Sequence, residues 1–237
     1  MPRKGDGMAG HVLQGDPDIP LILRPSARAR RITLRVSQVD GRVTVTLPRG
    51  IPEREALAFA AQKERWIRKH LAGRALQVDM VPGARLPLAC QEVTLAQGDG
   101  RSVRLEGATL LVPGPQDAMG RRVAGYLKAR ARDVLAGASD HYAARLGRAY
   151  TGLSLRDTRS RWGSCSSSGR LMYSWRLILA PPPVLNYVAA HEVAHLAEMN
   201  HGPRFWAEVE RIHGAYADPR QWLRRHGAEL HRYSFGD

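Results

Sequence analysis

Residues 191–195 read His-Glu-Val-Ala-His, and the two histidines can act together only if this run is helical. Residues four apart lie on nearly the same face of a helix, so His191 and His195 can bind one metal ion. Glu192 is then offset toward a water molecule on that metal, as in zinc hydrolases. The apolar run 184–190 has helical spacing and follows three prolines, which is typical of a helix start. The pattern predicts a buried helix whose histidines face a cleft.

His201 is the predicted third ligand, provided that the chain turns after His195. In an unbroken helix His201 would lie about 120° round the axis from His195 and would miss the metal. Asn200 tolerates the left-handed conformation and Pro203 cannot continue a helix, so we expect a break near Asn200. The spacing equals that of the metzincin proteases, but Glu198 stands where they carry a glycine, which argues against that clan. The other interpretation of His201 is a capping or surface residue, with three acidic residues as weaker ligand candidates: Glu198, Glu208 and Glu210.

Four sequence blocks occur in order around this motif, at residues 161–168, 175–181, 191–195 and 200–206. They read Arg-Trp-Gly-Ser-Cys-Ser-Ser-Ser, Trp-Arg-Leu-Ile-Leu-Ala-Pro, His-Glu-Val-Ala-His and Asn-His-Gly-Pro-Arg-Phe-Trp. Together they closely resemble the YgjP-like family of bacterial metallopeptidases, relatives of the SprT-like zinc proteases. The resemblance implies one zinc ion on His191, His195 and His201, with Glu192 as the catalytic carboxylate. It leaves the substrate open, because nucleotide pyrophosphate hydrolysis has also been proposed within the family.

The chemistry expected of such a site is hydrolysis. Zinc on three neutral imidazoles lowers the pKa of its bound water to about 7, and Glu192 would take the proton. Side chains that could contact the substrate or the transition state carry suitable donors: Arg161, Arg176, His213 and Tyr216. Phe205 and Trp206 are expected to pack behind His201 and support the ligand.

The net charge of +14 implies attraction to anions such as nucleic acid, nucleotides or acidic proteins. The densest basic run, residues 24–35, alternates with apolar residues, which favours a strand with a solvated basic face. We therefore expect a peptide or protein substrate, weak non-specific nucleic-acid or nucleotide binding, and no membrane association. The opening residues lack an apolar signal segment and two distant cysteines cannot form a disulfide framework, which together favour the cytoplasm.

Two other functions stay open at this point. The first is a metal-dependent nucleoside triphosphate pyrophosphohydrolase whose arginines bind phosphates, although no glycine-rich phosphate loop is present. The second is a nucleic-acid-associated binding protein with a structural metal, although a closed structural site has no use for Glu192.

The pattern along the chain predicts an α+β fold in three segments: a flexible N-terminus (1–19), a β-rich region with one helix (20–115), and a zincin-like metallohydrolase region (116–237). The β-rich region is expected to pack on the metallohydrolase region as one compact body. Strands 31–36 and 42–47 alternate around a turn at Asp40 and Gly41, and a helix over 52–71 follows. A long helix is expected over 116–146, ending at Gly147. A strand over 171–179 is expected to offer its edge to an extended substrate.

Overall fold

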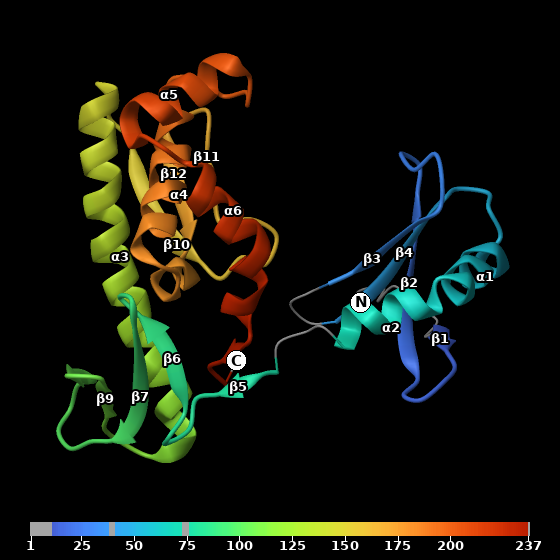
Figure 1. Cartoon of the computed structure of the whole chain (residues 1–237), viewed down its shortest axis with the longest axis horizontal. Coiled ribbons are helices and arrows are strands. Elements are labelled where there is room, and N and C mark those ends of the chain that lie inside the picture. Colours follow the sequence, from blue (N-terminus) through green and yellow to red (C-terminus); the bar gives the residue numbers. More distant parts are fainter. Residues whose placement is uncertain (1–10, 38–40, 73–75, 237) are drawn as a thin grey trace, which may run out of the picture. The chain divides into compact units, whose positions relative to one another are not determined.

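The computed structural model describes residues 11–37, 41–72 and 76–236, and the chain divides into two compact units, Met1–Ala75 and Leu76–Asp237 (Figure 1). The mixed α+β class is confirmed. Both the expected single compact body and the expected boundary after residue 115 differ from this division. Residues 76–115 belong to the larger unit because the apolar side chains of their strands share a core with the long helix that follows.

The smaller unit contains one sheet in the order β1-β2-β4-β3. Its strands are β1 (His11–Leu13), β2 (Ile19–Ser26), β3 (Thr33–Val36) and β4 (Val43–Pro48). The antiparallel pairing of β3 with β4 confirms the predicted pair, while Asp40 of the predicted turn lies outside the described residues. The expectation of a flexible terminus is wrong for His11–Leu13, which pair with β2, and residues 1–10 lie outside the described part.

One face of this sheet is buried against α1 (Glu53–Gln62) and α2 (Glu64–Ala72). The single helix expected over 52–71 is therefore two helices. The backbone tightens between them at Lys63, whose N–H lies 3.2 Å from the Phe59 carbonyl oxygen and 3.0 Å from that of Ala60.

The opposite face of the sheet carries the predicted basic residues. Arg24 of β2 pairs in register with Thr46 of β4, and Arg35 of β3 pairs with Thr44. Because Thr44 and Thr46 are two residues apart, both arginines lie on the same face, and both are exposed. The alternation in the sequence thus produces a basic, solvated sheet face.

The larger unit begins with a second four-stranded sheet, in the order β6-β7-β9-β8. Its strands are β6 (Arg85–Leu88), β7 (Gln91–Gln97), β8 (Arg104–Glu106) and β9 (Thr109–Val112). The long helix α3 (Met119–Leu146), preceded by the short η1 (Gln116–Ala118), runs from this sheet past α4 (Figure 1). Gly147 ends α3 at φ 75°, as predicted. A small parallel pair joins β5 (Val78–Asp79) to β13 (Tyr233–Ser234) near the end of the chain.

A three-stranded sheet in the order β10-β12-β11 lies next to the metal-binding motif. Its strands are β10 (Gly152–Arg156), β11 (Gly163–Cys165) and β12 (Arg170–Ser174). The expected strand 171–179 stops at Ser174 and continues as the buried 3-10 helix η2 (Trp175–Leu179). The expectation that this strand offers an edge is wrong, because β12 is hydrogen-bonded on both sides. Among the described residues, the edges of this sheet are the outer strands β10 and β11.

Helix α4 (Pro182–Ala194) carries the motif and starts at the predicted prolines. It ends near His195, earlier than expected. The chain then forms tight turns, in one of which the Ala197 N–H donates to the Ala194 carbonyl oxygen at 3.0 Å. The expected break before His201 is present, and it is made without a left-handed residue at Asn200, since among the described non-glycine residues only Ala89 and Cys90 have positive φ. The remaining helices are α5 (Pro203–His213), α6 (Ala217–His226) and η3 (Gly227–His231). Within the described part of the chain, no helix has the length and apolar character needed to cross a bilayer.

Candidate metal centre

Three histidine side chains converge at the end of α4. His191 lies in its last turn, His195 follows directly, and His201 comes from the short segment before α5. One ring nitrogen from each lies within 4.8 Å of the other two, and the Nε2 atoms of His191 and His201 are 3.0 Å apart. Two imidazole nitrogens on a tetrahedral zinc are ~3.4 Å apart, so the group fits one ion with little movement.

The protonation of these rings also suits a metal. Burial lowers the pKa of His191 to about 3, and it lowers the pKa of His195 as well. Both imidazoles are therefore neutral near pH 7, which is the form that binds metals. The Nδ1 atom of His195 lies 3.0 Å from the Glu198 carbonyl oxygen, so its N–H donates there and Nε2 is left for a metal. A set of imidazole ligands is typical of zinc and other transition metals, and not of magnesium or calcium.

Glu192 is buried beside this group, with 6% of its surface exposed. Burial raises the pKa of its carboxyl group to about 8, and the charge of Arg161 opposes that rise. Strand β11 packs directly on it: a Cβ atom at Gly163 would lie 2.5 Å from Glu192 Cγ and 2.6 Å from Oε1. Only glycine fits there without displacing the carboxylate. This role of Gly163 could not be identified from the sequence, although the glycine stands in the third position of the first family-like block.

Phe205 packs against all three histidines. Its ring centroid lies 4.8 Å from that of His191, 4.4 Å from that of His195 and 4.7 Å from that of His201. Trp206 lies 5.7 Å from His191 and 6.0 Å from His201. The first turn of α5 therefore lies against the ligand group, in the position that the sequence analysis expects for these two residues.

A chain of aromatic rings leads outward from the histidines. Tyr216 stacks on Trp206 at 5.2 Å and on Tyr187 at 6.3 Å, and the guanidinium of Arg220 lies 4.4 Å from the Trp206 ring centre. Burial raises the pKa of Tyr187 to about 12, and Arg220 counteracts this, so the phenol is protonated near neutral pH. Neither Tyr187 nor Arg220 was identified from the sequence, because nothing in the local pattern shows that α4, α5 and α6 meet here.

The other predicted contact residues are placed differently. The ring of His213 lies 6.0 Å from the ring of Tyr187, which in turn lies next to the ligand His191. Burial lowers the pKa of His213. Arg176 is buried and fully engaged: it forms a two-point ion pair with Asp157 at 2.7 and 2.9 Å and donates to the Leu230 and Tyr233 carbonyl oxygens. Its donors are therefore used inside the protein. Arg161 is exposed and close enough to Glu192 to act on its charge.

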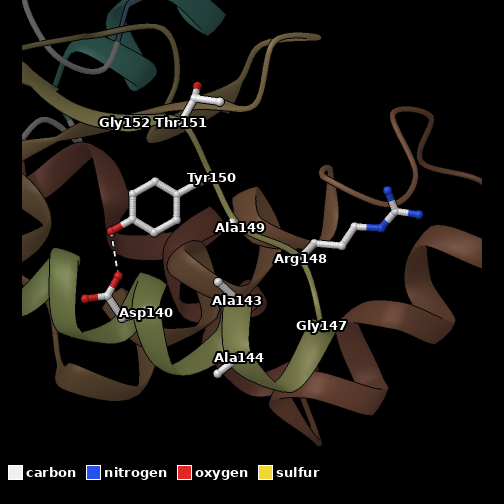
Figure 2. A pocket seen from close by; sticks show the side chains of 9 residues that line it. All are labelled: Asp140, Ala143, Ala144, Gly147, Arg148, Ala149, Tyr150, Thr151 and Gly152. Atoms are coloured by element: carbon white, nitrogen blue, oxygen red, sulfur yellow. Dashed lines mark hydrogen bonds between the residues drawn. The ribbon is translucent and has the colours of Figure 1, made fainter.

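Two neighbouring cavities lie near the centre. The first, of about 620 Å³, is lined by the C-terminal turn of α3 and the start of β10, and Figure 2 shows the Tyr150 hydroxyl pointing to Asp140, at 2.6 Å. None of the three histidines lines it. The second, of about 380 Å³, shares Arg148, Ala149 and Thr151 with it and reaches His195. Of these two cavities, only the second is therefore lined by one of the three histidines.

Fold and site define an α+β protein with a centre for one metal ion. The family described as YgjP-like, metallopeptidase domain, matches residues 30–226, so the chain belongs to the YgjP-like metallopeptidase family, as its sequence blocks predict. No curated protein matches the chain. Among solved structures, the crystal structure of the metallopeptidase zymogen of Pyrococcus abyssi abylysin is similar, with 21% identity and a TM-score of 0.35, over 44% of this chain and 97% of that one.

Proposed function

We propose that the protein is a zinc-dependent peptidase in which His191, His195 and His201 hold the ion and Glu192 is the general base. The observation that carries the proposal is the convergence of three histidines beside a buried carboxylate, in a chain of a metallopeptidase family. When bound, zinc supplies Lewis-acid activation of water and of the scissile carbonyl group.

The protein's own contribution to proton transfer comes from Glu192. Glu192 lies directly next to the ligand His191 in the sequence, and its ionised carboxylate can accept a proton from the attacking water. The same oxygen then delivers the proton to the leaving amine nitrogen. Gly163 keeps the carboxylate in place, because the β11 backbone packs directly against it.

Substrate binding is assigned to the free edge of β11. An extended peptide can add to this edge through backbone hydrogen bonds, which recognise any sequence. The cavity of about 380 Å³ that is lined by His195 offers room for side chains of the same peptide. Arg161, near Glu192, and Tyr216 remain candidates for stabilising charge in the transition state.

The test is a pair of assays on the zinc-reconstituted protein: cleavage of a peptide library and of unfolded proteins, and hydrolysis of nucleoside triphosphates. We expect peptide cleavage that is lost in Glu192→Gln with zinc content unchanged. Glu198→Gln is the matched control and should retain both zinc and activity, since only its backbone oxygen contacts His195. Triphosphate hydrolysis that depends on Glu192, without any peptide cleavage, would replace the proposal with the pyrophosphohydrolase.

A further inference from the structure

A cavity of about 630 Å³ lies where the turn after α5 meets the start of α6. Its lining includes Tyr216, Arg220 and Arg224. The proposed mechanism uses neither arginine. Both are exposed, and they lie four residues apart on the same face of α6.

The cavity is coupled to the metal centre through one aromatic ring. Arg220 lies 4.4 Å from the centre of Trp206, and Trp206 in turn lies 5.7 Å from His191. Tyr216, which lines the cavity, stacks on the same tryptophan. An extended peptide advances ~3.3 Å per residue, so a side chain a few positions from the scissile bond can reach Arg220.

The charges in the cavity are unbalanced. Like charges four apart on a helix repel each other and destabilise it. Within the described chain, neither Arg220 nor Arg224 forms an ion pair with a carboxylate, and Glu210, which also lines the cavity, is not within 4.0 Å of either guanidinium. A guanidinium above an aromatic ring can still present its N–H edge, which matches a carboxylate in a two-point contact.

We infer that this cavity is a carboxylate-binding subsite, in which Arg220 and Arg224 select peptides with an acidic group near the scissile bond. The inference rests on the proposed peptidase function and deepens it. The carboxylate can come from a Glu or Asp side chain or from the free C-terminus of the peptide, because both present the same two oxygens.

The kinetic test compares matched peptides that carry Glu or Gln at each position around the cleaved bond, and C-terminal acids with C-terminal amides. We expect Arg220→Gln to lower kcat/KM for the acidic peptide about five- to tenfold, chiefly through KM, and to leave the neutral peptide nearly unchanged. Arg225→Gln is the matched control, since Arg225 lies on the same helix but does not line the cavity. Arg220→Glu should reverse the preference toward a Lys peptide.

A binding arm separates this inference from the peptidase proposal. The zinc-loaded Glu192→Gln protein is titrated with the Glu and Gln peptides, with and without Arg220→Gln. Tighter binding of the acidic peptide that disappears in Arg220→Gln supports the subsite even if no peptide is cleaved by the wild type. Equal affinity for the two peptides, or an equal loss for both in Arg220→Gln, would overturn it, as would Arg220-dependent hydrolysis of a nucleoside triphosphate. If the Glu peptide with a C-terminal amide binds tightly, the bound carboxylate comes from the side chain. If only peptides with a free C-terminal carboxylate bind tightly, it comes from the C-terminus.

Discussion

Replacing Gly163 with alanine tests how closely the position of Glu192 is controlled. The backbone at Gly163 does not have a positive φ, so alanine costs no backbone strain there. Its Cβ atom would lie 2.5 Å from Glu192 Cγ, and ordinary contact begins near 3.4 Å, so the carboxylate side chain must retreat by about 0.9 Å. Both groups are packed in the protein, so the displacement falls on the general base.

The expected loss follows from that distance. A misplacement of ~1 Å in a catalytic group costs about 10²-fold in rate, or about 2.7 kcal/mol in the activation barrier. Overpacking should also lower the free energy of unfolding by about 1–3 kcal/mol. We expect Gly163→Ala to bind zinc normally, because the three atoms nearest to the new methyl group all belong to Glu192 and none to a histidine, while kcat/KM for peptide cleavage falls about 100-fold.

The assay measures kcat/KM, zinc content and the thermal unfolding midpoint on the same samples. Gly152→Ala is the matched control: it lies in the same sheet, and its nearest neighbour atoms are 3.7 Å away. Wild-type kcat/KM in Gly163→Ala, alongside an inactive Glu192→Gln, would refute the reasoning, because the carboxylate would then tolerate the displacement.

Three further outcomes are expected. Because Phe205 contacts all three ligands, Phe205→Ala should lower the free energy of unfolding by about 3–4 kcal/mol, measured by chemical denaturation, and weaken zinc binding about tenfold, measured with a competing chelator. Unchanged zinc affinity would show that the ring only fills the core. Arg176→Gln leaves Asp157 without its ion-pair partner, so it should lower the free energy of unfolding by about 3 kcal/mol while kcat/KM of the folded protein stays unchanged. A loss of kcat/KM without a loss of stability would show that Arg176 contacts the substrate. Duplex DNA should bind weakly and without sequence preference at low salt. The Arg24→Gln, Arg35→Gln double variant should reduce the slope of the logarithm of the DNA association constant against the logarithm of the salt concentration by about 2, and sequence-selective or salt-insensitive binding would contradict this.

Local signals in the sequence were enough to predict the elements that build the centre. The prolines before α4 and α5 and the glycine after α3 set helix ends through backbone restrictions that act within a few residues. The spacing of His191 and His195 follows from helix geometry alone. The convergence of His201 required a turn whose existence, but not its conformation, could be predicted from the sequence.

The remainder depends on contacts between distant segments, which periodicity does not encode. The position of β12 inside its sheet follows from its pairing with both β10 and β11. Arg176 forms an ion pair with Asp157 and contacts residues more than 50 positions away, so its residue type alone could not show that its donors are used inside the protein. The contacts of Gly163 with Glu192, and of Arg220 with Trp206, became visible only once the elements were packed.

The central claim is that one zinc ion on three histidines, served by Glu192, cleaves peptide bonds. The most direct measurement is zinc content and peptide cleavage on the same reconstituted samples of wild type, Glu192→Gln and the His191→Ala, His195→Ala double variant. We predict about one zinc with cleavage in the wild type, about one zinc without cleavage in Glu192→Gln, and neither in the double variant. Full zinc retention by the double variant, or wild-type cleavage by Glu192→Gln, would contradict the account.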